Sequence, residues 1–302
     1  MSPIERIALI GFGEAGSILG QDLARGGRRV CTYDVLLDEP GMAAAMRAKA
    51  ERCGVQVCAS VGAAVEGVQL VISAVTAAAS HMAATAAAES LGRGQLFLDI
   101  NSVAPATKVL NAGSIEASGA EYLDVAVMAP VPAQRLAVPM LLGGIGAMRW
   151  LDALRELGFS VSVISDRVGV ASAVKMCRSI VIKGLEALAL ESLMAARRLG
   201  AEEEVLRSLQ HSFPHMGWEA ELPDYLISRV AEHGRRRAAE MREVARTLES
   251  VGLAPLMALA TAARQDDLID AMGERGLRYE LERPFSWRLL ADRLTGKSSE
   301  TD

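Results

Sequence analysis

The chain has 302 residues, of which 51% are hydrophobic and 23% charged, and its formal net charge at pH 7 is −5. This length allows two domains with sizeable cores, and the negative net charge argues against nucleic acid as the main partner. The four cysteines show neither C-x-x-C nor zinc-ligand spacing, which favours buried thiols in a reducing cytoplasm.

The chain begins with a predicted buried strand over residues 4–10 and a helix over 14–26, joined by a glycine-rich turn. The turn reads Gly11-Phe12-Gly13-Glu14-Ala15-Gly16, which is a G-x-G-x-x-G pattern. In this pattern the first glycine allows the tight turn, the second lets the backbone approach a pyrophosphate, and the third lets helix and strand pack closely. The helix N-terminus would present free N–H groups to the phosphates. The turn therefore predicts a dinucleotide site.

An acidic residue, Asp34, closes the next predicted strand, 29–33. It follows the turn at about the spacing, roughly 20 residues, at which a carboxylate binds the ribose hydroxyls of NAD. That charge would repel the 2′-phosphate of NADP, and residues 35–38 contain no arginine to bind one, although Arg28 and Arg29 could still reach the rim. NAD is the predicted cofactor, NADP is less favoured, and the scattered histidines show no metal spacing.

Strands and helices alternate up to about residue 165. Further strands are predicted over 69–75, 96–100, 121–126, 138–143 and 160–164, and further helices over 41–53, 79–90, 104–117 and 146–157. The apolar stretch 68–88 contains Ser, Thr and His residues that fit a strand, a turn and a helix better than a membrane span. This alternation predicts an α/β Rossmann domain over 1–165 with a parallel, doubly wound sheet.

Ligands of such sheets bind at the carboxyl ends of the strands. The segments expected there for the cofactor are Gly11, Phe12, Gly13, Glu14, Ala15, Gly16, Asp34, Val75, Thr76 and Asn101. The segments expected there for the substrate are Ser102, Met128, Ala129, Pro130 and Val131. The Ser102 hydroxyl could touch the nicotinamide ribose or the substrate, or could cap the helix that begins near Pro105.

The pattern becomes wholly helical after residue 165. The segment 171–199 has no Pro and one Gly, and it could form one helix of about 43 Å. Its apolar residues lie nearly all round, which predicts burial in a homodimer or larger homo-oligomer, and its charged residues argue against a membrane span. Helical breaks are expected near 213–217, 223 and 252–255. We predict an all-α substrate and dimerisation domain over 166–294 and a disordered tail over 295–302.

The start of this long helix carries the chemical candidates, because Lys175, Arg178 and Ser179 fall on one helix face. With the glycine turn, an Asp-x-x-Ser-x-x-Pro element at 99–105 and a Gly-x-x-x-x-x-Lys helix start at 169–175, the chain resembles the β-hydroxyacid dehydrogenase superfamily. That superfamily includes 3-hydroxyisobutyrate and 6-phosphogluconate dehydrogenases, and the chain is similar to a subgroup with a phosphogluconate-dehydrogenase-like C-terminal domain. The resemblance implies hydride transfer between a β-hydroxy acid, or a related alcohol, and NAD, with Lys175 as general acid/base.

Hydride removal from an alcohol carbon requires that the hydroxyl proton is removed as well. A free lysine, with a pKa near 10.4, needs a downward shift of about 3 units to act as a base near neutral pH. Burial and neighbouring cations would lower the pKa of Lys175, and Arg178 lies one turn away. The alternative is a surface lysine that pairs with a carboxylate.

Three departures from the superfamily pattern affect the substrate. The usual Ser-Gly-Gly loop is replaced by the apolar stretch Val127–Pro132, the usual asparagine falls on Ser179, and the usual C-terminal Lys-Asp pair has no clear counterpart. A substrate carboxylate could be bound by Arg178 or by one of the run Arg235, Arg236 and Arg237. The open alternatives are an imine reductase, an oxidative decarboxylase and a non-catalytic NAD-binding regulator.

Overall fold

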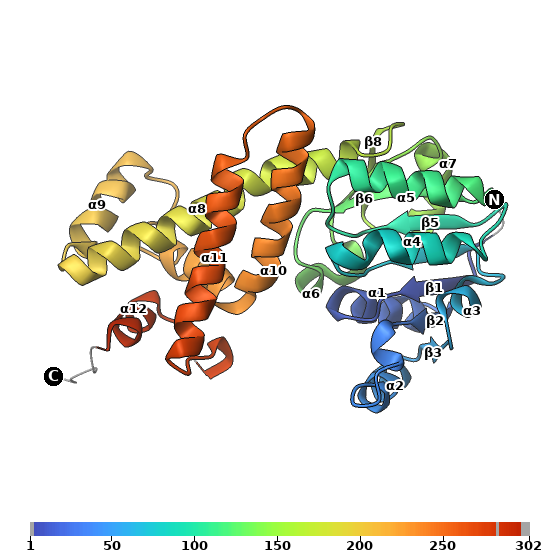
Figure 1. Ribbon diagram of the computed structural model, residues 1–302, viewed down its shortest axis with the longest axis horizontal. Coiled ribbons are helices and arrows are strands. Elements are labelled where there is room, and N and C mark those ends of the chain that lie inside the picture. The colour runs from blue at the N-terminus through green and yellow to red at the C-terminus, as the bar shows by residue number, and fades with distance from the viewer. Residues whose placement is uncertain (1–2, 282–283, 297–302) are drawn as a thin grey trace. The chain divides into compact units, whose positions relative to one another are not determined.

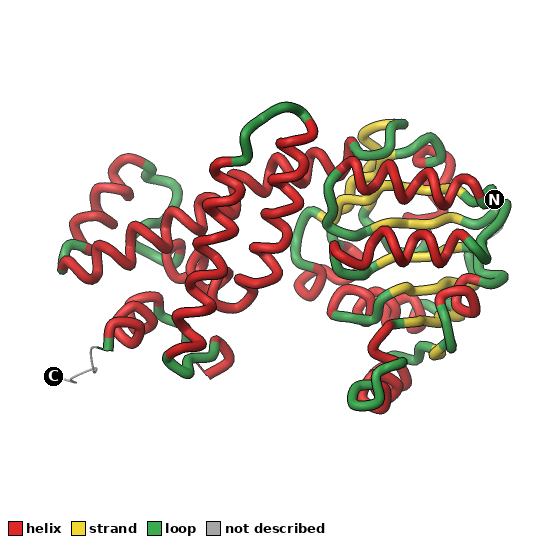
Figure 2. The backbone as a smooth tube through the Cα atoms, viewed as in Figure 1, coloured by secondary structure: helices red, strands yellow, loops and turns green. Residues whose placement is uncertain are grey.

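The computed structural model describes residues 3–281 and 284–296. The chain divides into two compact units, the first ending at Met176 and the second beginning at Cys177. The first unit is an α/β domain and the second is built from helices (Figure 2). The division falls inside the long helix α8 (Val170–Leu199).

One eight-stranded sheet forms the first unit, in the order β3-β2-β1-β4-β5-β6-β7-β8 (Figure 1). The strands are β1 (Arg6–Ile10), β2 (Arg29–Tyr33), β3 (Gln56–Val57), β4 (Leu70–Ser73), β5 (Leu96–Asp99), β6 (Glu121–Val127), β7 (Met140–Gly143) and β8 (Val161–Ser165). Six of the seven neighbouring pairs are parallel, which confirms the Rossmann prediction. The exception to the predicted parallel arrangement is β7, which runs antiparallel to β6. The chain between β6 and β7 forms only short helical turns and no crossover helix.

Both faces of the sheet are covered by helices, so successive strand residues pack into opposite layers. Ile7 and Leu9 belong to one core, with residues of α1 (Glu14–Arg25), α2 (Ala43–Arg52) and α7 (Ala147–Glu156). Ala8 and Ile10 belong to the other, with residues of α3 (Val61–Val65), α4 (Ser80–Ala88) and α5 (Pro105–Ala117). Burial on both faces explains why these strands read as continuous apolar runs in the sequence.

The elements that sequence analysis missed in this unit are short. They are β3, α3, α6 (Val131–Gln134) and the 3-10 turns η1 (Val35–Leu37), η2 (Ala77–Ala79) and η3 (Arg135–Ala137). None is long enough to show a helical or alternating period. The expectation of buried thiols is wrong for Cys177, which is exposed, while Cys31, Cys53 and Cys58 are half-buried.

The second unit contains most of α8 together with α9 (Glu202–Ser212), α10 (Leu222–Ser250), α11 (Leu256–Glu274), the turn η4 (Tyr279–Leu281) and α12 (Trp287–Thr295). α10 and α11 lie side by side (Figure 1). The core combines residues of all five helices, among them Leu193, Leu206, Ile227, Leu268 and Trp287. The described residues of this unit contain no strand, as predicted.

Two details of the predicted boundaries change. The break expected near residue 223 lies before it, because Pro223 occupies the first turn of α10, where its missing N–H costs nothing. Thr295 ends α12, so the predicted disordered tail does not begin there, and its residues 297–302 lie outside the described residues. Within residues 3–281 and 284–296, no helix has the length and hydropathy that a bilayer crossing would require.

Candidate functional site

The first and third glycines of the turn are required by the packing of the protein itself. Gly11 has a φ of +91°, and a Cβ there would lie 2.4 Å from the carbonyl oxygen of Ala74. A Cβ on Gly16 would lie 2.2 Å from the carbonyl oxygen of Gly11. At both positions, β1, β4 and the start of α1 lie so close together that no side chain fits between them.

Gly13 differs from both in the space around it. A Cβ there would meet no heavy atom within 4 Å. Gly13 is also the N-cap of α1, and no side chain caps that helix end. The space above Gly13 therefore opens onto a helix N-terminus with N–H groups available to an anion, and it fits a pyrophosphate.

Asp34 is fixed at the end of β2 by two backbone donors. Its Oδ2 accepts the N–H of Phe12 at 2.7 Å, and its Oδ1 accepts the N–H of Leu36 at 3.0 Å. A carboxylate oxygen can accept more than one hydrogen bond, so both oxygens keep acceptor capacity for the hydroxyls of a ribose. The glycine turn and Asp34 lie at the carboxyl ends of the adjacent strands β1 and β2, where such a group would sit.

A lysine that sequence analysis did not select also contacts the turn. Lys49 on α2 donates to the carbonyl oxygens of Phe12 and Gly13, both at 2.8 Å, and its ammonium lies 5.5 Å from the centre of the Phe12 ring. Lys49 therefore fixes the carbonyl side of the turn. Its position on an ordinary amphipathic helix gave no sequence signal for this contact.

The ends of β4 and β5 are joined by Asn101. Its Oδ1 accepts the N–H of Val75 at 2.7 Å, and its Nδ2 donates to the hydroxyls of Ser73 and Ser80. Asn101 is buried, so its amide serves this scaffold, whereas Val75 is half-buried and Thr76 exposed. All of the predicted cofactor residues thus follow the carboxyl ends of four adjacent strands, β2, β1, β4 and β5.

The structure brings the candidate acid/base, Lys175, onto Ser102. The Lys175 ammonium donates to the Ser102 hydroxyl at 2.6 Å, although the two residues are far apart in the chain. Both side chains are half-buried. The alternative role of Ser102 as a helix cap does not hold, because α5 begins at Pro105 and its N-cap is Ala104.

The arginines proposed for a carboxylate differ in their partners. Arg235 pairs with Asp266 and Asp270, Arg236 with Glu240, and the buried Arg237 with Glu186. Arg178 is exposed on α8, one turn beyond Lys175, and Ser179 beside it is buried. The run 235–237 is therefore occupied by carboxylates of its own unit, which leaves Arg178 as the better candidate.

The apolar stretch predicted to bind substrate is partly a helix. Met128 and Ala129 are half-buried, Pro130 is exposed, and Val131 begins α6 with its side chain in the core. The N–H of Met128 donates to the carbonyl oxygen of Pro139, which ties this segment to the start of β7.

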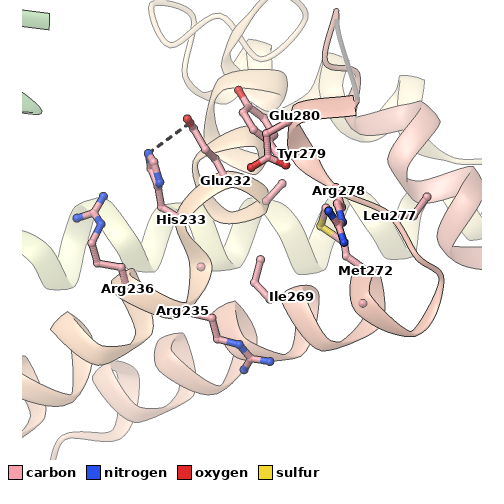
Figure 3. Close-up of a pocket in the computed structure, with 13 residues that line it drawn as sticks. Glu232, His233, Arg235, Arg236, Ile269, Met272, Leu277, Arg278, Tyr279 and Glu280 are labelled. Carbon is pink, nitrogen blue, oxygen red and sulfur yellow. Dashed lines mark ion pairs between the residues drawn. The ribbon is translucent and has the colours of Figure 1, made fainter. Parts of the chain in front are cut away.

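A hollow of about 470 Å³ lies within the second unit, between α10 and the end of α11 (Figure 3). It is lined by Arg235, Arg236, Met272, Arg278 and Tyr279 among others, and by His233, which lies 3.4 Å from the carboxylate of Glu232. Two of its cations, Arg235 and Arg236, already pair with carboxylates. Among the described residues, no cluster of His, Cys, Asp or Glu could hold a metal ion. The hollow is lined by neither the glycine turn nor Lys175 and Ser102.

Two family models match the sequence. The NAD binding domain of 6-phosphogluconate dehydrogenase matches residues 6–146, and a domain of unknown function (DUF1932) matches residues 196–268. The glycine turn, Asp34, Asn101 and Ser102 all lie within the first match.

Three relatives match most of the chain. A conserved hypothetical protein from Sinorhizobium meliloti 1021, with a crystal structure, is 37% identical, covers 97% of each chain and has a TM-score of 0.76. The solved structure of MTH1747, a conserved protein of unknown function described as similar to 3-hydroxyacid dehydrogenases, is 30% identical with a TM-score of 0.69, over 88% of this chain and 97% of that one. An uncharacterized 28.5 kDa protein of Methanothermus fervidus is 29% identical over 85% of this chain and 96% of its own length.

More distant structures share the fold. The 3-hydroxyisobutyrate dehydrogenase of Mycobacterium tuberculosis is 17% identical with a TM-score of 0.72, over 92% of this chain and 97% of that one. An imine reductase from Myxococcus stipitatus, solved with NADP+, is 18% identical with a TM-score of 0.55, over 90% and 95%.

Proposed function

This chain belongs to the β-hydroxyacid dehydrogenase-like family, and we propose that it is an NAD-dependent oxidoreductase that transfers a hydride between a β-hydroxy acid, or a related alcohol, and the cofactor. The observation that carries the proposal is the contact of 2.6 Å between Lys175 Nζ and Ser102 Oγ. Ser102 follows Asn101, which holds the ends of β4 and β5 together. Of these two strands, β4 lies beside β1, the strand that leads into the glycine turn.

The glycine turn and Asp34 would hold the nicotinamide cofactor, which when bound would supply the hydride acceptor for the carbon that bears the substrate hydroxyl. Lys175, as the free amine, takes the proton that leaves that hydroxyl, and returns it in the reverse direction. The Ser102 hydroxyl accepts a hydrogen bond from Lys175, and its own proton remains available to the substrate oxygen. The pair would therefore orient the alcohol and remove its proton.

We propose that Arg178 and Ser179 bind the acid group of the substrate, because they occupy the next turn of the same helix as Lys175. The guanidinium of Arg178 suits a carboxylate, with which it can form two parallel hydrogen bonds. The segment Met128–Val131 offers apolar surface and no side-chain hydroxyl. A substrate with an apolar group beside its hydroxy acid fits this combination.

Asp34 supports NAD as the cofactor, because a fixed carboxylate favours ribose hydroxyls and repels a 2′-phosphate. For the assembly, we propose a homodimer or larger homo-oligomer. Val181 and Leu188 on α8 are 69% and 58% exposed, which is unusual for large apolar residues seven positions apart on one helix.

The proposal is tested by initial rates of cofactor reduction with a panel of 3-hydroxy acids of both configurations, with NAD and with NADP. Turnover of at least one member that depends on Lys175 supports it. Release of CO₂ with each hydride would identify an oxidative decarboxylase, and turnover of cyclic imines alone would identify an imine reductase. Tight cofactor binding without turnover of any member would favour a regulator.

A further inference from the structure

A fully buried lysine lies behind the Lys175–Ser102 pair. Lys108 on α5 donates to the carbonyl oxygen of Asp99 at 2.6 Å and to Asp99 Oδ1 at 2.9 Å, and its Nζ lies 3.6 Å from Asp124 Oδ1. The side chains of Lys108, Asp99 and Asp124 have no solvent exposure. One ammonium is therefore shared by two buried carboxylates, an arrangement that is costly to bury and adds little stability compared with an apolar core.

Asp124 connects this ammonium to the helix that bears Lys175. Its Oδ2 accepts the backbone N–H groups of Gly169 and Ser172, both at 3.0 Å, and its Oδ1 accepts the Ser172 hydroxyl. A carboxylate from β6 thus caps the N-terminus of α8, where a negative charge is favourable. Lys175 lies less than one turn beyond Ser172, so the cap sets the position from which the Lys175 side chain leaves the helix.

Asp99 connects the same ammonium to the segment that bears Ser102. Its Oδ1 accepts the N–H of Asn101 at 2.9 Å, and its Oδ2 accepts the hydroxyl of Tyr122 at 2.7 Å and the side-chain amide of Asn111 at 3.0 Å. Burial, followed by the charge of Asp99, raises the pKa of Tyr122 well above 10.0, so the phenol keeps the proton that it donates. Asp99 is therefore held in place directly before Asn101 and Ser102.

We infer that Lys108 is a positioning residue that keeps Ser102 and Lys175 at hydrogen-bond distance. Its ammonium binds both Asp99, which fixes the segment before Ser102, and Asp124, which fixes the helix start before Lys175. A second contact supports the same link, because Gly169 has a φ of +93° and a Cβ there would lie 3.3 Å from Cβ of Pro105 at the start of α5. Lys108 and Asp124 act on the pair through the backbone segments that Asp99 and Asp124 fix. The catalytic consequence rests on the proposed function, whereas the geometric consequence does not.

Two variants of Lys108 test the inference. Lys108→Met removes the ammonium but leaves two carboxylates buried together, which can prevent folding. The second variant, Lys108→Met with Asp99→Asn, removes the ion pairs of Lys108. It leaves the summed charge at positions 99, 108 and 124 the same as in the wild type. The matched control is Ile115→Ala, because Ile115 is fully buried two turns further along α5 and touches neither aspartate through a hydrogen bond.

The readout is the acylation rate of Lys175 by a trace of acetic anhydride, measured by peptide mass spectrometry without substrate. The chain has five lysines, and Lys49, which contacts the glycine turn from α2, serves as the internal reference. Loss of the hydrogen bond between Lys175 and Ser102 should accelerate Lys175 acylation about 2- to 10-fold, the factor that corresponds to one net hydrogen bond. Ser102→Ala should give the same acceleration, and adding it to either Lys108 variant should give no further increase.

The catalytic readout is separate. If the proposed function holds, kcat of the Lys108 variants should fall by about tenfold or more, as for other misplaced catalytic groups, with cofactor affinity unchanged. Accelerated acylation without any turnover in the wild type would support the positioning role and contradict the proposed reaction. Unchanged Lys175 acylation in the folded double variant, or the same acceleration in Ile115→Ala, would overturn the positioning role.

Discussion

The backbone N–H of Phe12 donates to Asp34 Oδ2 at 2.7 Å, so the glycine turn after β1 and the carboxylate after β2 are fixed to each other. On the other side of the same residue, Lys49 donates to the Phe12 carbonyl oxygen at 2.8 Å. The turn is therefore held from both sides before any ligand arrives. Such preorganisation lowers the ordering cost of binding a dinucleotide.

This geometry predicts the choice of cofactor. Wild-type protein should bind NAD more tightly than NADP. Asp34→Ala should reduce this difference in affinity, because it should raise the dissociation constant of NAD about 10- to 100-fold, the contribution of hydrogen bonds to a charged group. Titrations of intrinsic fluorescence with both cofactors measure this. A lower dissociation constant for NADP in the wild type would contradict the assignment.

The glycines of the turn should respond differently to substitution. Gly13→Ala should leave the melting temperature nearly unchanged, because its Cβ would meet no neighbour. It should still weaken cofactor binding, because the Cβ would occupy the space proposed for the pyrophosphate. Gly16→Ala is the matched control and should lower the melting temperature, because its Cβ would lie 2.2 Å from the Gly11 carbonyl oxygen. Equal cofactor affinity in Gly13→Ala and wild type would place the pyrophosphate elsewhere.

Lys175→Ala should lower turnover by about 10²- to 10⁴-fold, the usual contribution of a positioned acid/base. Cofactor affinity should stay within a few-fold, because the glycine turn and Asp34 are untouched. In the oxidation direction, the wild type should show an acidic limb in kcat/KM that the variant lacks. Near-full turnover with an unaltered pH profile would show that another group moves the proton.

In the same assay, Arg178→Ala should raise KM for a hydroxy acid while leaving cofactor affinity unchanged, because Arg178 is proposed to bind the substrate carboxylate. Arg235→Ala is the control, since Arg235 already pairs with Asp266 and Asp270. A larger effect of the control on KM would move the carboxylate site to the second unit's arginine run.

A pH effect on stability is expected at Tyr33. Its hydrogen bond to Asp38, followed by burial, raises the pKa of Tyr33 from 10.0 to about 12. Because the folded state binds this proton more tightly than the unfolded state, the stabilisation is complete below pH 10 and is lost as the pH rises from 10 towards 12. The free energy of unfolding, measured with a chemical denaturant across that pH range, should decline less for Tyr33→Phe than for wild type. Tyr225→Phe, at an exposed position, is the control. Identical declines would remove Tyr33 as the cause.

The exposed apolar residues of α8 predict self-association. Val181→Glu with Leu188→Glu should convert a dimer or larger oligomer into a monomer in multi-angle light scattering, because two charges would be buried in the interface. Met148→Glu is the control, since Met148 on α7 is equally exposed at 69%. A monomeric wild type at micromolar concentration would contradict the prediction.

Much of the first unit could be predicted from local patterns. A continuous apolar run, three glycines at fixed spacing and an acid at the end of the next strand each carry their meaning within a few residues, because a Rossmann turn is built from neighbours in the chain. The seven longer strands and the longer helices α1, α2, α4, α5 and α7 follow from the same alternation. The long helix 171–199 was equally clear, since its length and lack of proline leave few alternatives.

The sequence by itself therefore determined the fold class, the cofactor turn and the candidacy of Lys175. Only the tertiary structure decided that Ser102 meets Lys175, that Arg235–Arg237 are occupied by carboxylates, and that Lys108 joins Asp99 to Asp124. These contacts join residues from different strands and helices, and a buried lysine on α5 has no local pattern that separates it from a solvated one. Such contacts form only when the folded sheet brings distant strand ends together. A short segment of the sequence therefore cannot predict them.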